Sequence, residues 1–257
     1  MKIKISAVLI CKNEEKNLPA CLNAIKNWVD EIIILDSGST DKSVMIAKQY
    51  TPFVYETDWP GFGPQKNRAI GYATGDWIFS LDADEIVSPE LAAEIQNLRS
   101  EANPSNFFNI FDAFDIFFQS YFLNQPIYFG DWRGDHAVCL FKKNIAEFDS
   151  SQVHEKLIFK KNKIKIGRLK NKIFHHSYPT QAHIQKKIYL YSKLSAEKLK
   201  QQGKIGGLYI GLIKASFNFL RGYLFKLGFL DGLAGLKLAW MNARYTFLKY
   251  YLIKKLN

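Results

Sequence analysis

Two carboxylates that lie two residues apart, Asp82 and Asp84, are the side chains in this sequence best placed for chemistry. They directly follow the apolar run Asp76–Leu81, so we expect them at the mouth of a β-strand. A carboxylate pair at such a position can share Mg²⁺ or Mn²⁺, which take oxygen ligands and bridge a diphosphate. The alternative is that the two residues cap the next helix or remain solvated.

A second acidic pair, Asp36 and Asp41, brackets a Ser-Gly-Ser-Thr loop before a predicted helix. The backbone amides of such a loop can bind a polar ligand, and a carboxylate can hold base or ribose hydroxyls. The loop has neither the Gly-x-Gly-x-x-Gly pattern of dinucleotide sites nor a P-loop pattern, so both of these folds are disfavoured. Taken alone, the pair also fits an ordinary capped turn.

Residues 61–68 combine two glycines with Lys66, Asn67 and Arg68 at the start of a predicted helix. Cationic side chains at a helix N-terminus are suited to phosphate. A solvated helix end is the alternative interpretation.

These groups need elements that position them, and the first hundred residues alternate strand and helix patterns. Apolar runs predict four strands, and helical spacing predicts four helices between and after them. This alternation is typical of βαβ units with a parallel sheet, in which ligands bind beyond the carboxyl ends of the strands. We expect Ser39 or Thr40 to cap the second helix and Ser88 the fourth. The predicted strands are Ile3–Ile10, Glu31–Leu35, Phe53–Glu56 and Asp76–Leu81, and the predicted helices are 18–25, Lys42–Tyr50, Pro64–Ala73 and Pro89–Arg99.

Residues 105–150 are rich in Phe and Tyr, and we expect them to complete the same domain and to contribute to an acceptor cleft. The aromatic run from Phe107 to Tyr121 is best explained by core packing. Val153–Ile158 and Lys163–Ile173 are predicted as strands, and a helical pattern begins at Gln181. We therefore predict a catalytic domain over residues 1–180 and a helical extension over residues 181–257.

Charge is unevenly distributed along the 257 residues, whose formal net charge is +11. Residues 1–100 carry 10 Lys and Arg against 14 Asp and Glu, whereas residues 101–257 carry 25 against 10. A basic C-terminal part typically binds nucleic acid, anionic lipid or another acidic partner. No apolar run is long enough to cross a membrane, and we expect no signal peptide and a cytoplasmic location. The odd number of cysteines, Cys11, Cys21 and Cys139, argues against a disulfide framework.

Taken together, Ile5–Glu15, Leu35–Asp41, Gly63–Asn67 and Gly75–Glu85 resemble family 2 inverting glycosyltransferases with the GT-A fold. This resemblance implies a Rossmann-like mixed sheet that binds a nucleotide sugar. More closely, the whole chain resembles the lipopolysaccharide core glycosyltransferases that add glucose to the inner-core heptose. The motifs that carry this closer resemblance are Phe129–Trp132, Leu140–Lys143, Val153–Glu155, Ile173–His175, Gly228–Gly232 and Phe247–Tyr250.

The resemblance also implies roles for individual residues. Asp36 would contact the uridine of a UDP-sugar, with Lys66 and Asn67 nearby. Asp82 and Asp84 would form the D-x-D motif for Mg²⁺ or Mn²⁺, with Asp84 the more direct metal ligand. His175 would be an additional ligand to the metal or the diphosphate.

Glu155 falls where such enzymes place the general base that accepts the proton of the acceptor hydroxyl. Asp131 or Asp135 is the alternative base, and Asp131 and Trp132 would shape the acceptor cleft. From the residues alone, Glu155 could instead form an ion pair with Lys156 or Lys160. The remaining histidines have no metal-ligand spacing and are expected to be packed or solvated; they are His136, His154, His176 and His183.

From Lys204 onward, basic and aromatic residues are mixed with apolar ones. This pattern predicts helices that lie on an anionic membrane surface; helices packed on the catalytic domain are the alternative. The expected function is transfer of a hexose, with glucose favoured, from a UDP-sugar to a lipopolysaccharide core heptose or a similar surface glycan. A family 2 transferase acting on a polyprenyl phosphate or another glycolipid is the alternative. A nucleotidyltransferase or a nucleic-acid-binding protein is disfavoured, because the loop after the first strand is acidic and no nucleic-acid-binding module is recognised.

Overall fold

The computed structural model describes residues 3–100, 107–150, 155–178 and 181–256 of the chain. It divides into two compact units. The first contains Met1–Phe118 and His136–His175, and the second contains Gln119–Asp135 and His176–Asn257. Residues 119–135 thus cluster with the C-terminal helices, whereas the sequence assigned them to the catalytic domain; the functional division at residue 180 stays a prediction.

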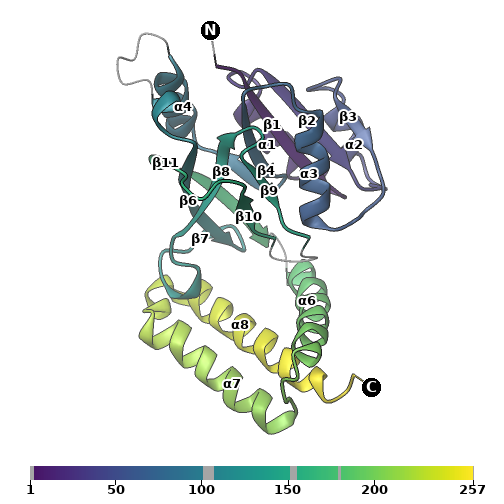
Figure 1. Cartoon of the computed structure of the whole chain (residues 1–257). Helices are drawn as coiled ribbons and strands as arrows, with labels where there is room; N and C mark the ends of the chain where they lie inside the picture. Colours follow the sequence, from purple (N-terminus) through teal and green to yellow (C-terminus); the bar gives the residue numbers. More distant parts are fainter. Residues whose placement is uncertain (1–2, 101–106, 151–154, 179–180, 257) are drawn as a thin grey trace. The chain divides into compact units, whose positions relative to one another are not determined.

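A mixed nine-stranded sheet forms the framework of the described chain, with the order β3-β2-β1-β4-β8-β6-β11-β5 and β7 beside β6 (Figure 1). The first four strands in this order are parallel. β8 runs antiparallel to β4, and β5 antiparallel to β11. The expected fold class, α/β with a mixed sheet and a helical C-terminal part, is confirmed. The strands are β1 Ile5–Cys11, β2 Glu31–Asp36, β3 Val54–Glu56, β4 Trp77–Asp82, β5 Glu85–Val87, β6 Ala113–Phe122, β7 Gln125–Pro126, β8 Asp135–Lys142 and β11 Ile166–Tyr178, with β9 Ala146–Phe148 and β10 Leu157–Phe159 forming a separate antiparallel pair.

The parallel part of the sheet has a hydrophobic core on each face, and β1 shows why. Alternate residues of a strand point to opposite faces. Leu9 packs into one core with the helices α1 (Leu18–Ile25) and α4 (Pro89–Arg99). Val8 and Ile10 pack into the other core. This core also contains Ala69 of α3 (Phe62–Tyr72) and Ala73, which directly follows the helix. Because both faces of β1 are buried, its sequence is a continuous apolar run and not an alternating one.

The helix starts confirm one predicted cap and correct the other. Ser88 caps α4, because its hydroxyl accepts a hydrogen bond from the Leu91 amide at 3.1 Å. The second helix, α2, is shorter than predicted (Ser43–Ala47) and is not capped by Ser39 or Thr40. Ser39 instead donates its hydroxyl to Asp36, and Asp41 accepts the Ser43 amide at 2.9 Å at the helix start.

The aromatic run after residue 106 forms a short helix, α5 (Phe107–Ile110), followed by β6. Phe108 and Phe114 are fully buried, and their rings lie 4.6 Å and 5.5 Å from that of Trp77. The predicted core-packing role is confirmed for these two residues.

The second unit is mainly helical. It contains α6 (Gln181–Gln201), α7 (Leu208–Leu220), a five-residue π-helical turn (Arg221–Phe225), a 3₁₀ turn (Gly228–Asp231) and α8 (Gly232–Ile253). Its core joins residues of α6 and α8 to Phe122 and Ile127. α7 and α8 run antiparallel and side by side (Figure 1). Within the described residues, every helix is too short or too polar to cross a membrane.

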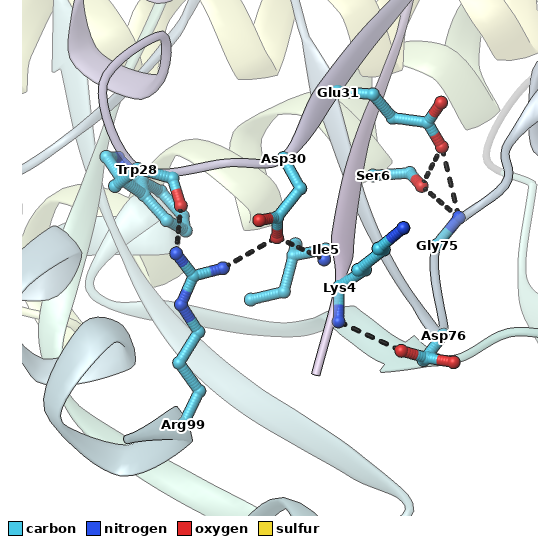
Figure 2. Close-up of polar contacts among 9 residues, drawn as sticks. All are labelled: Lys4, Ile5, Ser6, Trp28, Asp30, Glu31, Gly75, Asp76 and Arg99. Carbon is cyan, nitrogen blue, oxygen red and sulfur yellow. Dashed lines mark hydrogen bonds and ion pairs between the residues drawn. The ribbon is translucent and has the colours of Figure 1, made fainter. Parts of the chain in front are cut away.

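A polar cluster closes the edge of the sheet where β1 and β4 begin, opposite the edge where Asp82 lies. Glu31, the first residue of β2, accepts hydrogen bonds from the Ser6 hydroxyl and from the Gly75 amide, the latter at 3.1 Å (Figure 2). It also accepts one from the Thr74 amide. Partial burial opposes ionisation of Glu31, but these donors outweigh it and lower its pKa. At the same edge Asp30 accepts hydrogen bonds from the Ile5 amide and from Arg99 of α4 (Figure 2).

We predict that Glu31→Gln lowers the free energy of unfolding by about 2 kcal/mol at pH 7, because hydrogen bonds to an ionised acceptor are replaced by weaker ones. Since the pKa of Glu31 is lower in the folded than in the unfolded protein, this contribution is present above the unfolded pKa and is lost as the pH falls through the folded pKa. Urea denaturation at pH 7 and at about pH 3 should therefore show the two proteins converging in acid. Glu56→Gln, which removes an exposed ion pair with Lys48, is the control and should cost less than about 1 kcal/mol. A constant difference between wild type and Glu31→Gln across this pH range would contradict the prediction.

Candidate functional site

The register of the parallel strands brings the predicted acidic residues to one edge of the sheet. Asp36 is paired in register with Cys11 of β1, and Asp82 with Ile10. β1 therefore separates Asp36 from Asp82, and both lie at carboxyl ends of strands. The strand order reverses between β1 and β4, and at such a point α/β sheets bind their ligands.

Lys66 of α3 joins two of the predicted site residues. Its ammonium nitrogen lies 2.9 Å from Asp82 Oδ1 and 2.8 Å from Glu155 Oε1. The side chains of Lys66 and Glu155 are only 11% and 13% exposed, so this pair is shielded from solvent, whereas the Asp82 side chain is 40% exposed. Burial alone would lower the pKa of Lys66, but Asp82 and Glu155 raise it well above its ordinary value, so Lys66 is a fixed cation. Glu155 thus pairs with Lys66, whereas the alternative interpretation gave it Lys156 or Lys160 as a partner; Lys160 pairs with Glu147.

Glu85 shapes the turn that carries the two aspartates, a role that the sequence interpretation missed. The Glu85 carboxylate folds back and accepts a hydrogen bond from the Asp82 amide at 2.9 Å. Glu85 as a whole is only 8% exposed. Burial first, and then repulsion from Asp82, raises the pKa of Glu85 to about 8, although His175 opposes the shift. The sequence signal for this role was the position of Glu85 directly after Asp82-Ala-Asp84. The sequence predicted Glu85 only as one more member of the acidic cluster, whereas it begins β5.

Asp84 and His175 meet on the other side of this turn. The Nε2 atom of His175 lies 3.5 Å from Asp84 Oδ1, and β11 places His175 in register with Glu85. Burial would lower the pKa of His175, but Asp84, Glu85 and Asp82 together raise it to about 9. The predicted proximity of Asp84 and His175 is therefore present in the fold.

Asp36 is almost fully buried and organises the loop that follows it. Its Oδ1 atom accepts the amides of Gly38 and Ser39 at 2.9 Å and 2.8 Å, and its Oδ2 atom accepts the Ser39 hydroxyl. Cys11 Sγ lies 3.4 Å from the same oxygen, and burial with the nearby charge raises the pKa of the thiol. The carboxylate thus orders the Ser37–Thr40 loop; the direct contact of Asp36 with a uridine stays a prediction.

Asn67 and Gly63 dock the segment that carries Glu155 onto α3. The Asn67 amide donates to the Phe148 carbonyl and accepts the Phe148 amide, both at 2.8 Å. A Cβ atom on Gly63 would lie 1.7 Å from the Asp149 carbonyl oxygen and 3.6 Å from Glu155 Cβ. Only a glycine allows this close approach. Gly63 and Asn67 therefore both help to position Glu155.

Asp131, Asp135 and Trp132 belong to the second unit, where Asp131 pairs with Arg221 at 3.0 Å and with Lys226 at 2.9 Å. His136 is packed beside Asp115, and His176 is stacked on Tyr121. His154 and Val153 lie outside the described residues. In the rest of the strand predicted at 153–158, residues 155–156 are not in a strand and β10 covers the end.

The donor set at the turn fits a hard divalent cation better than a soft one. Asp82, Asp84 and Glu85 carry the carboxyl groups of the turn, and burial raises the pKa of the nearby thiols of Cys21 and Cys139. Among the described residues, no group of three or more His, Cys, Asp or Glu has the geometry to hold a metal by itself. A diphosphate-bound Mg²⁺ typically needs only one or two carboxylates, with phosphate oxygens and water completing its shell. Asp82 and Asp84 would therefore be enough to hold it.

The family of the chain follows from comparison with known sequences. The family model described as "Glycosyl transferase family 2" matches residues 6–189, which include every residue of the site described above. The chain belongs to glycosyl transferase family 2. The expected enzyme class, a glycosyltransferase, is thereby confirmed.

Relatives are similar over most of the chain. An uncharacterized glycosyltransferase of Rickettsia felis is 32% identical over 209 residues, covering 78% of this chain and 72% of the relative. An uncharacterized glycosyltransferase of Rickettsia typhi is 29% identical over 244 residues, covering 90% of this chain and 80% of the relative. Among solved structures, TarS residues 1–349 of S. aureus in complex with UDP-GlcNAc is 16% identical with a TM-score of 0.48, covering 97% of this chain and 82% of TarS.

We predict that Gly63→Ala disturbs the site, because the added methyl group must push the Asp149 backbone away from α3, next to Glu155. The expected result is a loss of sugar transfer of about 100-fold, as for other small displacements of reacting groups, together with a lower melting temperature. Gly71→Ala, on the same helix but with open space around it, is the matched control. It should keep full activity and gain about 0.5–1 kcal/mol of stability. Equal behaviour of the two variants in activity assays and thermal unfolding would contradict this view of Gly63.

Proposed function

We propose that this protein is a metal-dependent, inverting hexosyltransferase that moves glucose from UDP-glucose to a lipopolysaccharide core heptose or a similar surface glycan. The observation that carries the proposal is the double ion pair of Lys66, which joins Asp82 of the D-x-D turn to Glu155. A diphosphate site and a base for the acceptor hydroxyl are thereby held next to each other. Single-displacement sugar transfer needs this pairing, because the leaving group and the nucleophile act on the same anomeric carbon.

The donor site is supported by the groups around the carboxyl edge of β1, β2 and β4. The Ser37–Thr40 loop, whose Gly38 and Ser39 amides are held by Asp36, would line the site of the uridine and ribose. Lys66, in the second turn of α3, supplies a buried cation for the diphosphate. Asn67 helps indirectly in this account, by fixing the Phe148 backbone beside the same helix.

Asp84 and Asp82 would hold a divalent cation, with His175 as an additional ligand to the cation or to the diphosphate. Mg²⁺ or Mn²⁺ bound there supplies positive charge that offsets the charge developing on the departing diphosphate. In the described state His175 and Lys66 are the cations that face these carboxylates. Glu85 supports the turn from beneath through the Asp82 amide.

Glu155 would take the proton of the acceptor hydroxyl. The oxygen of that hydroxyl then forms a bond to the anomeric carbon, while the bond from this carbon to the UDP oxygen breaks with its electrons going to the diphosphate. One displacement from the opposite face inverts the anomeric configuration. Lys66 keeps the Glu155 carboxylate in place during this step.

The acceptor is proposed to be lipid-linked, with the enzyme peripheral to the inner face of the plasma membrane. The basic and apolar composition of the second unit supports an anionic membrane surface as a partner. The alternative acceptor is a polyprenyl phosphate in place of a core heptose. In that case the acceptor would differ, but the chemistry at the donor sugar would be the same.

We predict that Asp84→Asn reduces UDP release from UDP-glucose in the presence of Mn²⁺ and a heptose acceptor by at least about 100-fold. The amide keeps the shape of the side chain but removes the charge that would bind the cation. Asp58→Asn, which changes a side chain that is 78% exposed and pairs with Arg68, is the control and should retain full activity. Melting temperatures of both variants check folding; a folded Asp84→Asn enzyme with normal turnover would remove the metal site from the mechanism.

We predict a different signature for Glu155→Gln. The side-chain oxygen remains available to Lys66, so UDP affinity, measured by calorimetry, should change less than about threefold. Transfer to the acceptor should fall by about 100-fold or more, the usual contribution of a general base. Glu147→Gln, which removes an exposed ion pair with Lys160, should leave both quantities unchanged. Near-normal transfer by Glu155→Gln would rule out Glu155 and direct attention to Asp131 and Asp135.

A further inference from the structure

Exposed apolar side chains are concentrated in one part of the second unit. Of the 25 large hydrophobic residues that are exposed in the described chain, 15 lie between Ile205 and Trp240. Tyr209, Ile213 and Phe217 are 79%, 69% and 60% exposed. Soluble proteins rarely leave so many neighbouring apolar groups in water, so this surface is expected to have a partner.

The spacing of these residues shows that they form one face of α7. Tyr209, Ile213 and Phe217 recur every four residues, and the neighbouring stripe contains Leu208 and Leu212. Another side of the helix packs on α8 through Gly211, where a Cβ atom would lie 3.1 Å from the Phe247 carbonyl oxygen. The apolar face therefore points away from the helix pair, and packing within the unit does not cover it. We call it the α7 apolar face.

Aromatic contacts continue the α7 apolar face onto α8. The ring of Phe219 lies 5.4 Å from that of Tyr223 and 6.4 Å from that of Trp240, and Tyr223 lies 6.3 Å from Phe229. Trp240 is 68% exposed. Rings of this type favour the boundary between the hydrocarbon and the headgroups of a bilayer.

The charge of the second unit identifies the kind of partner. This unit contains 15 Lys and Arg and 4 Asp and Glu, a net charge of +11, whereas the first unit contains 20 of each and is neutral. If a second copy of the chain were the partner, two units with a net charge of +11 each would face and repel one another. An anionic bilayer instead offers both hydrocarbon for the apolar face and opposite charge for its basic residues, among them Lys214 and Lys237.

We propose that the α7 apolar face, with Trp240, inserts into the headgroup region of an anionic bilayer and holds α7 parallel to the membrane plane. This inference rests on the membrane-bound acceptor of the proposed function and specifies which side chains enter the lipid. Attraction by the basic residues concentrates the protein at the surface, and burial of the apolar side chains keeps it there.

The test uses the full-length protein with vesicles of phosphatidylcholine alone and of phosphatidylcholine with phosphatidylglycerol in a 3:1 ratio. The double variant Ile213→Ser/Phe217→Ser should reduce flotation with the anionic vesicles at least about tenfold. The matched control is Met45→Ser/Phe53→Ser, which removes two exposed apolar side chains from the first unit and should float like wild type. Anionic vesicles should also shift the tryptophan emission of wild type to the blue, and Trp240→Phe should remove most of this shift.

The outcomes separate this inference from the proposed function. Flotation of Ile213→Ser/Phe217→Ser equal to that of wild type would overturn the inference, as would a wild-type dimer in sedimentation that this variant dissolves. Transfer to a lipid-free heptose acceptor should be the same in wild type and in this variant. If transfer proceeds but no protein floats, only the membrane inference fails; if the apolar face controls flotation but no sugar is transferred, only the function fails.

Discussion

The ion pairs of one buried ammonium group, that of Lys66, hold the candidate site together. A lysine that is mostly withdrawn from water is stable only if opposite charges surround it, and Asp82 and Glu155 supply them. The consequence is mutual: each carboxylate also depends on Lys66 for its position. Three parts of the chain that are distant in sequence, namely α3, the end of β4 and Glu155, are thereby fixed around one point.

Much of the first hundred residues could be predicted because the signals there are local. Apolar runs gave the four parallel strands to within two residues, and Ser88 followed by Pro89 marked the start of α4. The position of Asp82 at a strand end followed from the same run. Once the strands are parallel, their carboxyl ends must meet, so the common edge of Asp36 and Asp82 was also within reach of the sequence.

The partners of the site residues could not be predicted in the same way. Lys66 and Glu155 are brought together by the docking of β9 on α3, which depends on Gly63 and Asn67 and leaves no periodic trace in the sequence. Local reasoning therefore offered Lys156 or Lys160 as partners of Glu155. Ser39 was likewise predicted as a helix cap, because its commitment to the buried carboxylate of Asp36 is a tertiary contact.

The turn after β4 is the proposed binding place of the diphosphate and its cation, and diffraction can locate both. A crystal of the protein grown with UDP and MnCl₂ should give an anomalous manganese peak about 2.2 Å from carboxylate oxygens of Asp82 or Asp84, with the diphosphate beside Lys66. Manganese and UDP bound together elsewhere, with the Leu81–Glu85 turn and Lys66 unchanged, would contradict the account.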